Sequence, residues 1–395
     1  MRAVICGAGI AGLALAGRLY DVLGWDVVVL EKAPRPRAEG YMIDFFGPGY
    51  DAAEAMGVLP WLRELSHPVS EAAFVDEHGR CRARLGYDRF ARSLNGRLLS
   101  IMRPDLELAL RERLSFAVDL RFGVGPARID PRSQGVRVTL TDGSVLDADL
   151  LVGADGLHST VRAMALAEER RCVRHLGHHT AAFTFDDPLV HAEVGDRFCL
   201  TDTVDRQMGL YALRDGRVAA FAVHRSADPG RPEDARAALR HEYGSLGWLV
   251  PRALAACPPH SRVYYDQVAQ ADPPSWSRGR VVLVGDSCQA VSLLAGQGAS
   301  LAVAGAYVLA DQLAGARRVE DALRGYERLW RPVVRDRQRA ARRTARWFVP
   351  ATAGRLRVRR AALRLAALPG ASRLAGLSTA GRRRPVLRQL AVASR

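Results

Sequence analysis

The chain has 395 residues, of which 48% are hydrophobic, and it carries a formal net charge of +15. This length and apolar content can fill a large core and exceed one ordinary domain, so we expect two lobes. The six cysteines form neither a CxxC pair nor a regular disulfide frame, and no charged segment of the kind found in a signal peptide precedes the first apolar run. Both observations favour a cytoplasmic protein with reduced thiols.

The chain begins with a predicted strand, a glycine-rich turn and a helix. The apolar run 3–6 leads into Gly7-Ala8-Gly9-Ile10-Ala11-Gly12, and a helical apolar pattern continues to residue 19. In such a unit the first glycine permits the turn, the second lets backbone approach a pyrophosphate, and the third allows close packing of helix on strand. The segment predicts a dinucleotide-binding site.

A second predicted strand, 26–30, ends at Glu31, which lies 19 residues after Gly12. A carboxylate at this distance can accept hydrogen bonds from both hydroxyls of an adenosine ribose, and it would repel a 2′-phosphate. We therefore expect that the bound dinucleotide is not NADP. The motif does not distinguish NAD from FAD, because both use the same phosphate site.

Two hairpins are predicted next, over 70–85 around the turn 77–80 and over 136–152 around the turn 141–144. Between them, a helix with apolar spacing is predicted to begin at Arg103, which precedes a proline. The runs 150–152 and 281–284 predict buried strands, each followed by an acid: Asp155 in Gly153-Ala154-Asp155-Gly156, and Asp286 after Gly285. Taken from the residues alone, Asp155 could stand in a plain turn and Asp286 could be a helix N-cap.

Alternating strands are predicted from 181 to 225, with a turn at 214–217, and we interpret them as a sheet on the substrate side. Histidines 175, 178, 179 and 224 fall in or near this region, but their spacing favours sheet or surface histidines over metal ligands. No metal site is predicted. The uncharged stretch 287–310 is long enough to raise the question of a membrane span, but its glutamines, serines and glycines favour the protein interior.

The basic charge is concentrated at the end of the chain. Residues 317–395 contain 22 arginines and four acids, a balance of +18, which leaves −3 for the rest. Within 355–368, Val358, Ala361, Leu365 and Leu368 can form one helical stripe flanked by arginines. Such a helix could lie on an anionic membrane or touch nucleic acid, but we favour a terminal helix docked on the body with a solvated basic face. The scarcity of aromatic residues argues against a nucleic-acid partner.

The sequence contains three glycine–acid signatures: the turn Gly7–Gly12 with Glu31, Gly153–Gly156 with Asp155, and Gly285-Asp286. Together they resemble those of the class A FAD-dependent monooxygenases, the family of para-hydroxybenzoate hydroxylase, the polyketide aromatic hydroxylases and the tetracycline-inactivating flavoenzymes. The motifs follow the family's order from Arg2 to about Gln312. The resemblance implies an α/β fold: a Rossmann-type FAD-binding domain (1–69, 100–172 and 276–316), an inserted β-sheet substrate domain (70–99 and 173–275) and a basic C-terminal helical segment (317–395).

The resemblance also implies roles for individual residues. Glu31 would hold the adenosine ribose, Asp155 would serve both FAD and the nicotinamide donor, and Asp286 would bind the ribityl chain. The segment Gly296–Gly298 opens a long apolar helix, whose positive end favours negative charge on a reduced flavin. The implied cofactor-binding residues are Gly7, Gly9, Ile10, Ala11, Gly12, Glu31, Lys32, Arg103, Asp155, Asp286, Gly296, Gly298, Ala299 and Ser300.

The chain departs from the family pattern in three places. Lys32 stands where the family usually has arginine, Gln289 replaces a histidine, and Ser292 stands where a proline is expected to shape the floor beside the isoalloxazine ring. FAD binding remains the expectation, but the last two changes affect the usual geometry for an aromatic substrate.

The reaction implied by the resemblance is reduction of FAD by NADPH or NADH, addition of O₂, and transfer of one oxygen atom from a flavin hydroperoxide to a small aromatic or polyketide-like substrate. Hydroxylation is the leading hypothesis; epoxidation, Baeyer-Villiger insertion or a same-fold flavin-dependent reductase are the alternatives. Because the cofactor performs the bond chemistry, no catalytic side chain is named.

Overall fold

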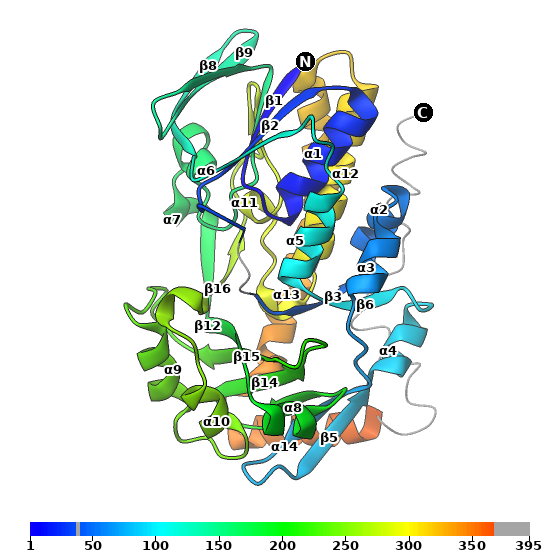
Figure 1. The fold of residues 1–395 in the computed structure, drawn as a ribbon, viewed down its shortest axis with the longest axis vertical. Coiled ribbons are helices and arrows are strands. Elements are labelled where there is room, and N and C mark those ends of the chain that lie inside the picture. The colour runs from blue at the N-terminus through cyan, green and yellow to red at the C-terminus, as the bar shows by residue number, and fades with distance from the viewer. Residues whose placement is uncertain (37–39, 367–395) are drawn as a thin grey trace.

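The computed structural model describes residues 1–36 and 40–366, with the side chains of 344–346 and 366 excepted. Two sheets lie one above the other along the long axis of the molecule (Figure 1). Helices cover the upper sheet and the outer side of the lower one. The α/β fold predicted from the sequence is confirmed.

The upper sheet has six strands in the order β17-β18-β11-β1-β2-β7. All are parallel to their neighbours except β17 at one edge. Every residue of the inner strands β11 and β18 is buried, as expected for a parallel sheet covered on both faces. The strands span β1 Arg2–Cys6, β2 Asp26–Glu31, β7 Asp119–Phe122, β11 Leu150–Gly153, β17 Ser277–Arg278 and β18 Val281–Leu283.

Three helices pack together beside this sheet: α1 (Ile10–Leu23), α5 (Arg103–Glu112) and α12 (Gly298–Gly315). Helix α5 begins at Arg103, as predicted, and α12 lies in the uncharged stretch that raised the membrane question. Among the described residues, no helix is both long and apolar enough to cross a membrane. Smaller helices on this half are α2 Pro48–Ala55, α3 Leu59–Leu65, α6 Thr160–Ala165, α7 Glu169–Cys172 and α11 Asp286–Gln289.

The hairpin predicted over 136–152 is shorter than expected. Strands β8 (Pro126–Arg132), β9 (Gly135–Leu140) and β10 (Val145–Ala148) form a separate antiparallel sheet that ends at Ala148. The chain then passes into β11, which pairs with β1 and β18. The prediction was wrong at this point because a continuous apolar run does not show where a chain leaves one sheet for another.

The lower sheet has seven strands in the order β16-β12-β15-β14-β13-β4-β5. The predicted hairpin around 77–80 is its β4–β5 pair, and the turn at 214–217 joins β14 to β15. All seven strands fall within 70–99 and 173–275, although the division into domains stays a prediction. They span β4 Glu71–Val75, β5 Cys81–Gly86, β12 Val173–Phe185, β13 Phe198–Thr201, β14 Arg206–Ala212, β15 Val218–Arg225 and β16 Tyr264–Ala271.

Both faces of the lower sheet are apolar, as β15 shows. Val218 and Ala220 point into a core shared with helices α8 (Pro188–Val194), α9 (Ala235–Tyr243) and α10 (Val250–Ala255). Ala219 and Phe221 point to the opposite face, into a second cluster that reaches Met42 and Leu294. The second face therefore looks toward the upper half of the molecule.

A small antiparallel pair connects the two halves. Strands β3 (Met42–Phe46) and β6 (Leu98–Met102) lie between the two large sheets (Figure 1). Alternate residues of β3 face opposite ways: Ile43 and Phe45 join the upper core, whereas Met42 joins the cluster below. Helix α4 (Tyr87–Ser93) lies beside this pair.

The last described elements are helix α13 (Val319–Phe348) and helix α14 (Ala353–Ala366), which docks on β5 of the lower sheet. The apolar stripe predicted for this segment does not face the body. Val358 and Leu365 are 59% and 62% exposed, whereas Arg359 is only 2% exposed and pairs with buried Asp202. The terminal helix therefore docks on the body, as favoured, but through a different face, because the prediction considered only apolar residues. Leu368 lies outside the described residues.

Candidate functional site

The glycines of the first turn bring β1 and α1 into close contact. Gly7 has φ of +112°, and a Cβ at Gly7 would lie 2.4 Å from the Ala154 oxygen. A Cβ at Gly12 would lie 1.9 Å from the Gly7 oxygen. At Gly9, by contrast, the nearest atom would be 3.5 Å away. Gly7 and Gly12 thus serve the backbone geometry, while Gly9 keeps open the space in front of the helix.

The N-terminus of α1 opens into a cavity of about 160 Å³ at the carboxyl ends of β1, β11 and β18. No side chain caps this terminus, and its first turn contains no acid. Free N–H groups and the positive end of the helix dipole suit a phosphate there. We call this space the dinucleotide cavity. Of the residues predicted to bind cofactor, it is lined by Gly9, Ile10, Ala11, Arg103, Asp286, Gly296, Gly298 and Ala299.

Two charged groups of opposite sign face the dinucleotide cavity. Arg103 pairs with Glu107 one turn along α5, with an N–O distance of 2.7 Å. Asp286 is surrounded by protein, but its side chain is accessible because it opens into the cavity. Burial raises the pKa of its carboxyl, and the nearby Arg103 opposes that shift. An acid in such a place is well suited to accept hydrogen bonds from ligand hydroxyls.

A second uncapped helix terminus also reaches this cavity. Helix α12 follows Gly296, which has φ of +62°, and Gln297 at the N-cap position makes no side-chain capping bond. The first turn of α12 contains no acid. The terminus of α12 therefore offers the favourable environment for negative charge that the sequence predicts.

The other predicted residues do not line the dinucleotide cavity, and their cofactor contacts stay predictions. Glu31 ends β2 and accepts hydrogen bonds from the backbone N–H groups of Ala8 and Ala33, at 3.1 and 2.9 Å. Lys32 beside it is exposed. The hydrogen bond between Glu31 and Ala8 connects the end of β2 to the glycine-rich turn.

Asp155 and Ser300 make bonds within the protein. Asp155 accepts from the Ser159 hydroxyl at 2.5 Å and from the Val161 N–H at 3.0 Å, at the start of α6. The Ser300 hydroxyl accepts from the Gly49 N–H at 2.9 Å and donates to the Phe46 oxygen. Both side chains therefore hold neighbouring segments in place.

The sequence did not predict a network of charged residues that lies beside the dinucleotide cavity. Asp266 on β16 lines the dinucleotide cavity and accepts from Arg231 at 2.7 Å. His158 lies between Asp266 and Glu169, with N–O distances of 3.2 and 2.8 Å. Hydrogen bonds to Asp266 and then to Glu169 raise the pKa of His158. No local signal connects these residues, because they come from three distant segments.

The two departures at 289 and 292 have different structural consequences. Gln289 lines neither this cavity nor the one described next; its amide donates to the Tyr326 hydroxyl, and its oxygen accepts from the Trp330 ring N–H at 3.2 Å. Ser292 does line the dinucleotide cavity, with φ of +102°. Gln289 is thus a core residue, whereas Ser292 shapes the cavity floor through an unusual backbone conformation.

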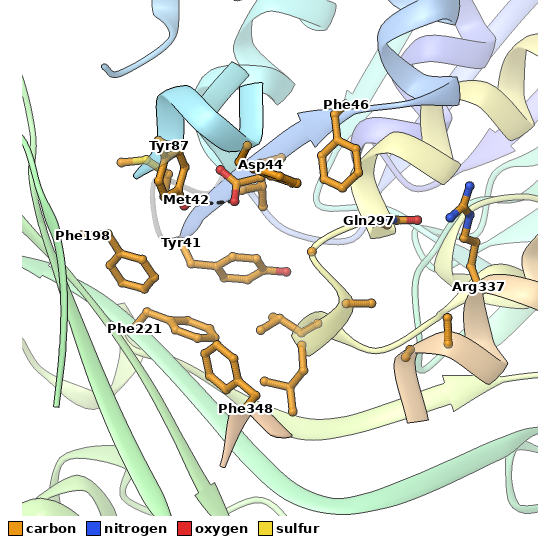
Figure 2. Close-up of a pocket in the computed structure, with 18 of the residues that line it drawn as sticks. Tyr41, Met42, Asp44, Phe46, Tyr87, Phe198, Phe221, Gln297, Arg337 and Phe348 are labelled. Atoms are coloured by element: carbon orange, nitrogen blue, oxygen red, sulfur yellow. Dashed lines mark hydrogen bonds between the residues drawn. The ribbon is translucent and has the colours of Figure 1, made fainter. Parts of the chain in front are cut away.

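A second cavity, of about 290 Å³, lies between β3, the lower sheet and α13. We call it the aromatic cavity, because eight of its 19 lining residues are aromatic (Figure 2). Burial raises the pKa of the Tyr41 hydroxyl at its centre to about 12. The polar residues that line it include Asp44, Gln297 and Arg337. Its aromatic residues are Tyr41, Phe46, Tyr87, Phe90, Phe198, Tyr211, Phe221 and Phe348.

The two cavities share a wall. Tyr41, Ile43, Leu293 and Gly296 line both of them. Tyr41 directly precedes β3 and Ile43 lies in it, whereas the other two come from the segment before α12. A molecule in the aromatic cavity would therefore lie directly against one in the dinucleotide cavity.

Three of the four histidines noted in the sequence lie close together. His179 lies with its ring centre 5.9 Å from His175 and 5.6 Å from His224. Burial lowers the pKa of His178 and His179, and that of His224 to about 4. No group of three or more histidine, cysteine, aspartate or glutamate side chains with the geometry of a metal site occurs in the part of the chain that the structure describes.

Comparison with known proteins agrees with this architecture. Residues 1–341 match the model of the FAD binding domain family, so the chain belongs to that family. The FAD-dependent monooxygenase asL6 of Sarocladium schorii is 30% identical over 365 residues, which cover 86% of each chain. The 3-amino-4-hydroxybenzoate 2-monooxygenase of Streptomyces cremeus is 31% identical over 363 residues, 88% of each chain. The tetracycline destructase Tet(51) shares the fold, with a TM-score of 0.80 at 23% identity over 96% of this chain and 97% of the other.

These findings define a class A flavoenzyme. The protein is an FAD-dependent monooxygenase. The dinucleotide cavity fits this cofactor, because it offers an uncapped helix terminus for a pyrophosphate, an acid that faces the cavity and a second helix terminus near the aromatic cavity.

Proposed function

We propose that the enzyme uses NADPH or NADH and O₂ to insert one oxygen atom into a small aromatic or polyketide-like molecule, with hydroxylation as the outcome. The observation that carries this proposal is the aromatic cavity and the wall it shares with the dinucleotide cavity at Tyr41, Ile43, Leu293 and Gly296. A flat apolar substrate would contact the rings there while its reacting carbon faces the flavin.

The chain's own contribution is binding and exclusion of water. When bound, FAD supplies the electron transfer and the oxygen activation. The rings of Phe198, Phe221 and Phe348 line one side of the aromatic cavity (Figure 2), and a substrate that packs against them would displace solvent. The uncapped terminus of α12 would supply positive potential to a flavin bound in the dinucleotide cavity. The likeness to 3-amino-4-hydroxybenzoate 2-monooxygenase supports an aromatic substrate.

The test is oxygen uptake by the purified FAD-loaded protein, with NADPH and NADH assayed separately against a panel of phenols and polyketide aromatics. We expect substrate-dependent oxygen consumption and one ¹⁸O atom from ¹⁸O₂ in the product. Reduction of a substrate under argon, without incorporation of oxygen in air, would favour a reductase instead and overturn the proposal. Product structure separates hydroxylation from epoxidation and Baeyer-Villiger insertion.

A further inference from the structure

Asp44 is the acid among the described residues that line the aromatic cavity. It stands in the middle of β3, where its neighbours along the strand are apolar. Because strand residues alternate, Asp44 projects to the same side as Met42 and Phe46, which also line this cavity. The carboxylate is thus part of the proposed substrate site and not of the dinucleotide cavity.

Neutral groups hold this carboxylate in position. Its oxygens accept hydrogen bonds from the Ser100 hydroxyl at 2.8 Å and from the Tyr87 hydroxyl at 3.0 Å. Within residues 1–36 and 40–366, no ion pair to Asp44 is present. Burial raises the pKa of Asp44, and the two hydrogen bonds oppose the shift only in part. Each carboxylate oxygen can accept more than one hydrogen bond, so a ligand donor can still bind.

The surroundings of Asp44 favour a cation. Aromatic rings attract positive charge on their faces, and the attraction grows when water is excluded. Phe198 and Tyr211 stack with ring centres 4.0 Å apart, and both line the same cavity. In Figure 2, Asp44 and Tyr87 lie on one side of the cavity, and Arg337 with Gln297 lie away from them. The negative and positive ends of the cavity are therefore separated.

We propose that Asp44 is a specificity-determining residue that selects substrates with a protonated amine, which pairs with the carboxylate among the aromatic rings. The inference rests on the proposed function, because it takes the aromatic cavity as the place where substrate binds. A cationic substrate would supply the missing counter-charge of Asp44. Its aromatic part would then extend along the shared wall toward the flavin.

The experiment measures binding to the FAD-loaded protein without turnover. Three probes of nearly equal shape are titrated at pH 8, with the flavin absorbance change and calorimetry as readouts: 2-(2-naphthyl)ethylamine, 2-(2-naphthyl)ethanol and 2-naphthylacetate. We expect the amine to bind at least about tenfold more tightly than the alcohol, since a hydrogen bond to a charged partner contributes more than one between neutral groups. The carboxylate probe should bind most weakly.

Asp44→Asn keeps the shape and removes the charge. It should weaken binding of the amine about tenfold or more and leave binding of the alcohol within about twofold. Tyr87→Phe is the matched control: it removes one hydrogen bond to Asp44 but keeps the carboxylate, so the preference for the amine should persist. FAD content of each variant shows that the upper half is intact.

Equal binding of amine and alcohol to the wild type, or an unchanged preference in Asp44→Asn, would overturn the inference. If Asp44→Asn loses FAD, the wild-type comparison decides alone. Selective binding of the amine without oxygen insertion into any substrate would overturn the proposed function and leave the binding inference standing. Oxygen insertion into neutral or anionic substrates, with no preference for the amine, would do the reverse.

Discussion

The Cα of Gly12 faces the carbonyl of Gly7 so closely that a Cβ there would lie 1.9 Å from the oxygen. This contact fixes the distance between β1 and the start of α1. Gly9, three residues earlier, differs from Gly12, because a methyl group at Gly9 would clash with no protein atom. The two glycines of this motif therefore have different roles.

Gly12→Ala should therefore lower the free energy of unfolding by about 3 kcal/mol or more, as expected for overpacking against rigid backbone. Gly9→Ala should leave the stability of the FAD-free protein nearly unchanged but reduce its affinity for FAD, because the added methyl group would project into the space for the phosphates. Urea unfolding of the FAD-free forms and titration with FAD measure the two effects. Equal loss of FAD-free stability in both variants would contradict the assignment.

Gly17→Ala in the same helix serves as a control. Its Cβ would meet Leu114 at 3.6 Å, an ordinary contact. Alanine costs less backbone entropy than glycine in a helix interior, so this variant should gain about 0.5–1 kcal/mol in unfolding free energy. Its affinity for FAD should equal that of the wild type.

The ion pair between Arg359 and Asp202 should be important for stability, since both side chains are buried. Arg359→Met would leave the carboxylate with Arg360 alone, and removal of one partner from a buried pair costs roughly 3–5 kcal/mol. We expect a loss near the lower end, measured by urea unfolding. Arg357→Met, at an exposed position of the same helix, should change stability by less than about 0.5 kcal/mol.

His158 should make stability depend on pH. Its pKa is raised in the folded protein by hydrogen bonds to Asp266 and Glu169, so its contribution is fully present below the ordinary value of 6.5 and is lost as pH rises through the folded pKa. The difference in unfolding free energy between wild type and His158→Gln should thus be larger at pH 6 than at pH 9. His241→Gln, at an exposed position, is the control for the substitution itself. A constant difference for His158→Gln would show that the ion pairs contribute little.

Gln289 should act on the core and not on the flavin. Gln289→Ala would leave the Trp330 N–H without its acceptor and open a cavity next to Gly305, at a cost of about 2–3 kcal/mol. Chemical unfolding measures the loss. The flavin reduction potential and absorbance spectrum should stay unchanged, because Gln289 lines neither cavity. A shifted potential would place this residue in contact with the cofactor environment.

The upper half of the molecule was largely predictable because its signals are local. The turn at Gly7–Gly12, the acid at the end of β2 and the helix beginning at Arg103 each depend on residues close in sequence. The aromatic cavity was not predictable, since it combines Asp44, Phe198 and Phe348 from distant segments. One signal was present: Asp44 is a lone acid in the apolar strand sequence Met-Ile-Asp-Phe-Phe.

Helix α14 shows a different reason for failure. Amphipathic analysis assumes that apolar residues face the body, but here Arg359 faces inward because Asp202 provides a buried partner. The choice between these faces depends on Asp202, which follows β13 and lies 157 residues away in the sequence. A periodic pattern contains no information about that partner.

The alternation along β3 has a consequence for how the enzyme can diversify. Met42, Asp44 and Phe46 contribute to the aromatic cavity, whereas Phe45 is packed in the upper core. Mutation at the even-numbered positions can change which molecules are accepted without disturbing the half that holds the flavin. Ile43 is the exception, since it lines both cavities, so the separation along this strand holds for Met42, Asp44 and Phe46 against Phe45.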